Sequence, residues 1–227
     1  MLLSAACASQ TDTAPTSGST GAKPDSAPLD SRDAGKLAAP LGERATAVVN
    51  FAPGPCAGFG KDELPGVVLG APKGGGTNQG SLDVLSLGAG GSIVLSFAPF
   101  DIIDGPGADF TVFENAFQYG AQVFAEPGRV AVSADGTHWT EFPCDPKAAG
   151  YPGCAGKTPT LCTDDNGVSD ADASVSGGDS FDLAAVGVAS ARFVRVTDAS
   201  RADCDSGVES AGFDLDAVSL VHSARIP

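Results

Sequence analysis

An all-β domain, a β-sandwich of the jelly-roll type with long loops, is the fold that the sequence predicts. The chain has 227 residues, of which 30 are glycine and 16 are proline, and this composition favours short strands joined by tight turns. The apolar runs after residue 45 are short, and helical i, i+3, i+4 patterns are missing there. With 42% hydrophobic residues, the chain can bury the core of one sizeable domain.

The apolar runs predict the strands in chain order. They cover residues 48–51, 66–70, 82–87, 92–97, 110–114, 129–133, 138–142, 192–196 and 213–221. Glycine-containing segments at 88–91 and 134–136 predict hairpin turns between neighbouring strands. A helical turn is expected at 181–186, capped by Asp179 or Ser180, and Trp139 is expected in the core.

The N-terminal segment predicts a lipid anchor followed by a tether. Residues 1–7 resemble a truncated lipoprotein signal in which Cys7 carries the lipid, although Ser4 and the missing charged region depart from the pattern. We therefore expect the true start to lie upstream; the alternative is a disordered end with an incidental cysteine. Residues 8–44 are rich in Ser, Thr, Ala, Gly and Pro, which predicts a disordered linker before a domain at 45–227.

The charge excludes some partners. The net charge is −15, and no cluster of Lys and Arg exists that would neutralise the phosphates of a nucleic acid. No run approaches the about 20 apolar residues of a membrane span, so contact with a membrane is expected through the lipid anchor only. The acidic side chains either collect divalent cations or simply keep an exported protein soluble.

Carboxylates inside the strand patterns point to a cation. Alternation places Glu114 on one face with Phe110 and Val112, and it places Asp214 and Asp216 with Val218 and Leu220. Buried carboxylates need a positive partner, and oxygen ligands at a sandwich rim suit Ca²⁺. The candidate calcium ligands are Asp104, Asp109, Glu114, Glu126, Asp214 and Asp216. Ion pairs with Arg192 or Arg195, and ordinary exposure, are the alternatives.

Five runs carry a family resemblance: residues 104–115, 124–136, 177–183, 191–196 and 212–218. In order and spacing they resemble a family of bacterial cell-surface proteins, many of them lipoproteins, with a galactose-binding-like jelly roll distantly similar to discoidin-type domains. The resemblance implies a surface-exposed binding or adhesion module, often with a structural calcium ion, and no enzymatic activity.

A contact surface is expected in the loop after the strand 110–114. Asn115, Phe117 and Tyr119, with Phe124 nearby, are the candidates for binding a glycan or a surface protein; packing within the loop is the alternative. A glycan hydrolase that uses Glu114, Glu126 and Asp216 is a second hypothesis, and a purely structural envelope protein is a third. The leading prediction is a non-catalytic lipoprotein at the bacterial outer membrane or cell surface.

The cysteines predict disulfides, because an exported location permits them. With Cys7 lipidated, Cys144 and Cys154 flank one Pro- and Gly-rich loop and form the first expected pair, and Cys162 with Cys204 forms the second. Cys56 is then left over. A zinc site is the alternative, but no Cys-x-x-Cys pair and no adjacent His is present.

Overall fold

The structure, a computed structural model, describes residues 43–163, 165–200, 204 and 210–226. The predicted lipid-anchor segment with Cys7 and residues 8–42 of the predicted linker lie outside the described residues. The last two residues of that linker, Glu43 and Arg44, bond to the end of the last long strand: Arg44 bridges to Ser219, and the carbonyl of Glu43 accepts from Leu220.

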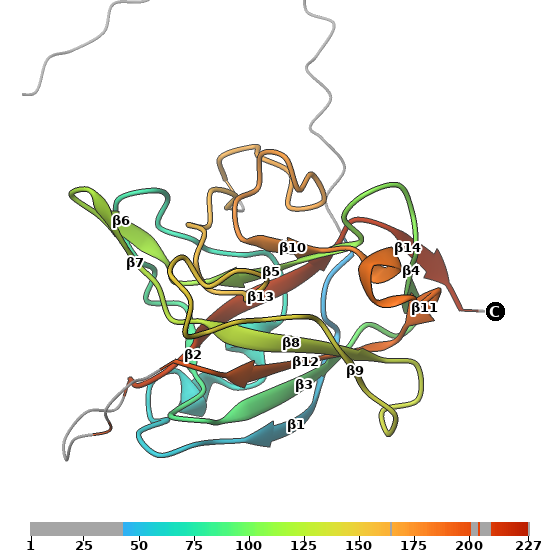
Figure 1. Cartoon of the computed structure of the whole chain (residues 1–227), viewed down its shortest axis with the longest axis horizontal. Coiled ribbons are helices and arrows are strands. Elements are labelled where there is room, and N and C mark those ends of the chain that lie inside the picture. The colour runs from blue at the N-terminus through green and yellow to red at the C-terminus, as the bar shows by residue number, and fades with distance from the viewer. Residues whose placement is uncertain (1–42, 164, 201–203, 205–209, 227) are drawn as a thin grey trace, which may run out of the picture. The chain divides into compact units, whose positions relative to one another are not determined.

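Two antiparallel sheets form a β-sandwich, as predicted (Figure 1). The first has the order β1 (Ala47–Ala52), β3 (Ser92–Ser96), β12 (Phe193–Asp198), β8 (Gly128–Ser133) and β9 (Thr140–Glu141). The second has the order β10 (Asp179–Phe181), β5 (Phe110–Glu114), β13 (Asp214–Leu220) and β2 (Leu85–Ser86). Strands β3, β5, β8, β10, β12 and β13 belong to the two sheets in turn, so the chain crosses between the layers as in a jelly roll.

Two small sheets extend the sandwich at opposite ends (Figure 1). One is the hairpin of β6 (Phe117–Tyr119) and β7 (Gln122–Phe124). The other has the order β11 (Ser190–Ala191), β4 (Phe100–Ile103) and β14 (Ser223–Arg225). None of these five short strands was predicted, because their sequences lack a clear apolar alternation.

Helical structure in the described part of the chain is limited to three short 3₁₀ helices, η1 (Lys61–Glu63), η2 (Gly66–Val68) and η3 (Leu183–Val186). The predicted strand at 66–70 is wrong, since η2 occupies its first half. The predicted turn at 181–186 exists as η3, but its cap is Asp182, whose side chain accepts from the N–H of Ala184. Asp179 and Ser180 belong to β10 instead.

The main core lies between the two sheets and follows the alternation of their strands. Every second residue of β3, β8 and β12 points inward and meets the inner residues of β5 and β13: Ile93, Leu95, Val130, Val132, Val194, Val196, Phe110, Val112, Leu215, Val218 and Leu220. Trp139 is not part of this core; it is half-buried beside Arg195, whose guanidinium lies 4.6 Å from the ring centroid.

A bulge changes the faces of β13. Leu215 pairs with Glu114 and Ala217 with Phe113, so Asp216 is the extra residue opposite β5. Leu215 consequently shares the core face with Val218, three residues away. The prediction that Asp214 and Asp216 share the face of Val218 and Leu220 is therefore wrong.

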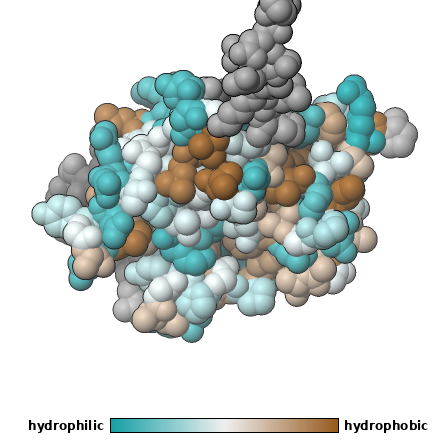
Figure 2. All heavy atoms as spheres, turned by 90° about the horizontal axis from the view of Figure 1, so that it is seen from above, coloured by the Kyte–Doolittle hydropathy of each residue, from teal (hydrophilic) through white to brown (hydrophobic). Residues whose placement is uncertain are grey.

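The loop between β9 and β10 covers the outer face of the second sheet. Cys162 of this loop packs with Phe113 and Ala217, which point away from the main core. As a result, every residue of β5 and β13 is buried. Figure 2 shows this side of the molecule, with hydrophobic residues gathered near its middle among hydrophilic ones; Leu161 and Val175 of the loop are exposed.

Two disulfides close the domain. The predicted Cys144–Cys154 bond is confirmed. The predicted Cys162–Cys204 bond is wrong: Cys204 pairs with Cys56, across a separation of 148 residues, and Cys162 is a buried free cysteine. Disulfides of this kind indicate an oxidising compartment outside the cytosol, extracellular or periplasmic.

Candidate functional site

The six predicted calcium ligands lie in three separate places. Asp109 precedes β5 and Glu114 ends it, so the strand rise alone puts them roughly 17 Å apart. Asp216 lies in the bulge of β13, where its carboxylate accepts from the backbone N–H of Lys73. Glu114, Glu126 and Asp214 interact electrostatically at the other end of β5. We call these three residues the rim cluster.

Glu114 is the most unusual member of the rim cluster. Its side chain is 2% exposed, and neither carboxylate oxygen has a hydrogen-bond partner among the described residues. Burial raises the pKa of Glu114 well above its usual value, and the charges of Asp214 and Glu126 raise it further. The backbone N–H groups of Asn115 and Asp214 lower the pKa in part, although neither makes a hydrogen bond of normal geometry to the carboxylate.

Asp214 lies at the start of β13 and is 8% exposed. Its Oδ1 has no hydrogen-bond partner among the residues that the structure describes. Burial raises the pKa of this carboxyl group, and hydrogen bonding with the side chains of Ser86 and Asn115 lowers it in part. Two neighbouring acids therefore have buried oxygens without donors, which is costly unless protons or a cation neutralise them.

Glu126 completes the rim cluster because two glycines let its segment approach β13. A Cβ atom on Gly128 would lie 2.5 Å from the ring of Phe213, and one on Gly156 would lie 2.9 Å from it. The ring fills the space that side chains would need, and Asp214 follows Phe213 directly. Burial first, then the charges of Asp214 and Asp198, raise the pKa of Glu126 to about 8.

Asp198 lies beside the rim cluster and differs from it. Its carboxylate accepts hydrogen bonds from the backbone N–H groups of Gly90, Ser200 and Phe213. The sequence analysis missed Asp198, although it is in phase with the buried Val194 and Val196 in β12. The same alternation that identified Glu114 would have found it. Three backbone N–H groups thus satisfy Asp198, whereas neither oxygen of Glu114 accepts a hydrogen bond from a described residue.

A second group of acids lies near the start of β5. One oxygen each of Asp104, Asp109 and Asp182 lie within 4.8 Å of one another, so the three could hold a metal ion. However, Asp109 already accepts from the N–H groups of Gly105 and Leu183 and contacts His222. Asp182 caps η3. The protein's own donors thus occupy most of this group, unlike the oxygens of the rim cluster.

The arginine alternative is wrong for the described residues. Arg192 makes a two-pronged ion pair with Asp101, with distances of 2.8 and 3.2 Å. Arg195 stacks over Trp139. Neither guanidinium is bonded to a candidate calcium ligand, so this strand supplies no ion-pair partner to the rim cluster.

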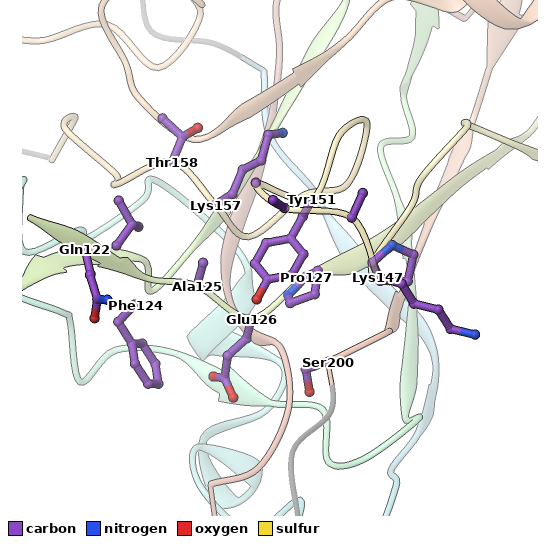
Figure 3. A pocket seen from close by; sticks show the side chains of 15 residues that line it. Gln122, Phe124, Ala125, Glu126, Pro127, Lys147, Tyr151, Lys157, Thr158 and Ser200 are labelled. Atoms are coloured by element: carbon purple, nitrogen blue, oxygen red, sulfur yellow. The ribbon is translucent and has the colours of Figure 1, made fainter.

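A pocket of about 970 Å³ opens beside Glu126 (Figure 3). One wall is residues 122–127, which include β7, and the other is residues 146–151 of the loop closed by the Cys144–Cys154 bond. Lys157, Thr158 and Ser200 complete the lining. The size is at the upper end of typical small-ligand sites.

The predicted contact residues lie outside this pocket. Asn115 accepts from the N–H of Ser81 and so holds a neighbouring loop. Phe117 stacks on Phe124 across the β6–β7 hairpin, with ring centroids 5.1 Å apart. Tyr119 is 80% exposed at the hairpin tip. Only Phe124 of the aromatic residues considered at this loop lines the pocket.

Comparison with known proteins identifies no family for this chain. The sequence matches no protein-family model, and no curated protein shows significant similarity to it. No helix among the described residues is long and apolar enough to cross a membrane.

Proposed function

We propose that the domain is a non-catalytic, calcium-stabilised binding module of an exported surface lipoprotein. The observation that carries the calcium assignment is Glu114, a buried carboxylate with two unpartnered oxygens beside Asp214 and Glu126. Hard oxygen ligands of this kind fit Ca²⁺, and the ion would supply the positive charge that neutralises them. Its role is structural: it would hold the start of β13, the end of β5 and residues 126–128 together.

Thermal melting with and without Ca²⁺ tests the metal. A cation bound only by the folded state stabilises it by about 2.7 kcal/mol at a concentration one hundred times Kd. We expect the Tm of the wild type to be higher with added Ca²⁺ than with chelator. The Tm of Glu114→Gln should be the same in both conditions. Asp104→Asn, which alters an exposed acid at the other end of β5, is the matched control and should respond like the wild type.

Two results would contradict this part of the proposal. One is a wild-type Tm that does not respond to Ca²⁺. The other is a response that survives in Glu114→Gln and disappears in Asp104→Asn, because the ion would then lie with Asp104, Asp109 and Asp182 instead.

The lipid anchor at Cys7 belongs to the same proposal. It rests on the small residues before Cys7 and on the disulfides, which agree with export. In a bacterial host that processes lipoproteins, the full-length protein should fractionate with membranes and Cys7→Ser should be released. An equal distribution of both proteins would exclude lipidation at this residue. The bacterial surface or the outer membrane is the expected location.

The ligand of the module is proposed to be a glycan or a surface protein, bound by the loops at the end where the β6–β7 hairpin projects. Exposed apolar side chains support this choice: Tyr119, Val123 and Phe124 of the hairpin are 80%, 47% and 49% exposed. Such a group of apolar side chains is typical of a contact surface.

One observation favours a second candidate, a glycan hydrolase. Glu126 lines the pocket, and its pKa of about 8 would keep it protonated at neutral pH, as a general acid requires. Asp216, which was considered as its partner, does not line this pocket. Release of reducing ends from polysaccharides by the wild type, lost in Glu126→Gln with the fold intact, would favour the hydrolase over the binding module.

A further inference from the structure

The pocket beside Glu126 presents an aromatic side chain from each wall. Phe124 comes from β7, and Tyr151 comes from the opposite loop; Figure 3 shows both with Glu126. In that view the hydroxyl end of Tyr151 points toward the segment that carries Glu126 and Pro127. Apolar ring faces and hydrogen-bonding groups therefore line the same cavity.

Tyr151 has a left-handed backbone conformation, which costs a tyrosine more free energy than it would cost a glycine. Its φ is +47°, and Cys56 is the other non-glycine residue with positive φ in the described part of the chain. Nothing in the backbone hydrogen bonds of the loop requires a tyrosine: its N–H donates to Ala148 and its carbonyl accepts from Cys154. A tyrosine held at a strained position suggests that the ring itself has a use.

A disulfide and a backbone hydrogen bond brace the wall that carries Tyr151. The Cys144–Cys154 disulfide closes it, and Cys154 is fully buried. A hydrogen bond from the N–H of Asp145 to the carbonyl of Pro152 ties the two sides of the loop together. The opposite ring is also held, because Phe124 stacks on Phe117. A pocket whose rings are already positioned loses little conformational entropy on binding.

Some polar side chains of the pocket already bond to the protein, and others are free to bond to a ligand. Lys157 and Thr158 both donate to Asp179, so they serve the scaffold. Gln122 and the hydroxyl of Tyr151 also line the cavity, and neither makes a side-chain hydrogen bond among the described residues. Amide and hydroxyl groups beside ring faces match a sugar, which has apolar C–H faces and equatorial hydroxyls.

We infer that this pocket binds a neutral saccharide, one sugar ring of which stacks on Tyr151 while its hydroxyls bond to Gln122. The inference rests on the proposed binding function and names its ligand and site. The net charge of −15 and the acid Glu126 in the lining disfavour a phosphorylated or strongly acidic ligand, and the exposed Lys147 is the lining cation that such a ligand would have to use. The site differs from the tip of the β6–β7 hairpin, since Tyr119 does not line it.

The test is binding of the whole chain to an array of neutral and uronic-acid-containing oligosaccharides, followed by titration of the strongest neutral one. Tyr151→Gly removes the ring and relieves the backbone, so its Tm should stay equal or rise while affinity falls about tenfold or more. Tyr151→Phe keeps the ring and should keep most of the affinity. Val175→Ala, which alters an exposed apolar residue of the loop over β5 and β13 outside the pocket, is the control and should bind like the wild type, whereas Tyr119→Ala tests the hairpin tip.

The outcomes separate this inference from the proposed function. Two results would overturn the inference. One is an unchanged affinity of Tyr151→Gly, and the other is a protein that binds only the acidic oligosaccharides of the array. Loss of binding in Tyr119→Ala alone would move the ligand to the hairpin tip, which overturns the inference and keeps the binding module. Neutral-saccharide binding that depends on Tyr151 in a protein without any calcium response would support the inference and remove the calcium part of the proposed function.

Discussion

Nδ1 of His222 lies 2.9 Å from Oδ1 of Asp109, a carboxylate with no exposed surface. The same carboxylate accepts from the N–H groups of Gly105 and Leu183. Asp109 therefore joins three segments that are distant in sequence: the loop before β5, the start of η3 and the end of β13. This explains its burial without a metal ion.

We predict that Asp109→Ala destabilises the domain by about 3 kcal/mol or more, because it leaves buried donors without an acceptor. Urea unfolding would measure the change. Asp104→Asn alters an exposed acid of the same loop and should change the free energy of unfolding by less than about 0.5 kcal/mol. Equal effects of the two substitutions would show that the contacts of Asp109 contribute little.

The raised pKa values of the rim cluster predict a pH-dependent stability in calcium-free buffer. The folded state holds a proton on Glu126 up to a pKa of about 8, whereas the unfolded chain releases it near 4.5. The unfolded state thus binds fewer protons between these pH values, and the free energy of unfolding falls as pH rises. Glu114 acts in the same direction.

Chemical unfolding in chelator between pH 5 and 8 would measure this slope, which is at most about 1.4 kcal/mol per pH unit for each proton. Glu126→Gln should reduce the slope of the free energy of unfolding against pH. Saturating Ca²⁺ should reduce the same slope in the wild type, and its binding should release protons. A stability that rises with pH over this range in chelator would contradict the assigned direction.

The two disulfides should differ in their contribution to stability. By chain entropy alone, the Cys144–Cys154 bond, with a separation of 10, contributes about 2.7 kcal/mol, and the Cys56–Cys204 bond, with a separation of 148, contributes about 5 kcal/mol. Unfolding of the two paired Cys→Ser variants would compare them. The Cys144–Cys154 variant should in addition weaken saccharide binding, because its wall of the pocket loosens. A larger loss of stability from the shorter loop would refute the entropic order.

Cys162 should be unreactive in the folded protein. Burial, followed by the charge of Asp170, raises the pKa of its thiol to about 12, so almost no thiolate exists at pH 8. A disulfide reagent such as Ellman's should label no thiol per chain natively and should label Cys162 after unfolding under non-reducing conditions. Rapid labelling of the native protein would show that the loop over β5 and β13 opens readily. The prediction concerns Cys162 in a protein whose Cys7 is blocked by lipid or replaced by serine.

The sandwich was predictable because period-two alternation is strong in its central strands. Val194 and Val196 in β12, and Ile93 and Leu95 in β3, show this alternation plainly. The bulge at Asp216 has no comparable signature, since an extra residue in one strand depends on the partner strand. One unrecognised bulge was enough to assign Asp214 and Asp216 to the wrong face.

The candidate site was predictable only in part, for two physical reasons. Glu114 stood out because a carboxylate was in phase with Phe110 and Val112. Its neighbours depend on how distant loops pack, and Phe213 between Gly128 and Gly156 determines that packing. Cysteine pairing is likewise a property of the folded chain, because the sequence positions of Cys56 and Cys162 do not show which of them reaches Cys204.

The disulfide between Cys56 and Cys204 has a mechanical consequence. A pull between the two ends of the chain would first load Arg44 and then β1, an edge strand that pairs with β3 alone. Once β1 has separated, the tension would reach Cys56 and cross the sulfur–sulfur bond directly to Cys204. The covalent path therefore bypasses residues 57–203, which include both walls of the pocket, whereas β13 and β14 lie between Cys204 and the far end of the chain and carry the load together with β1.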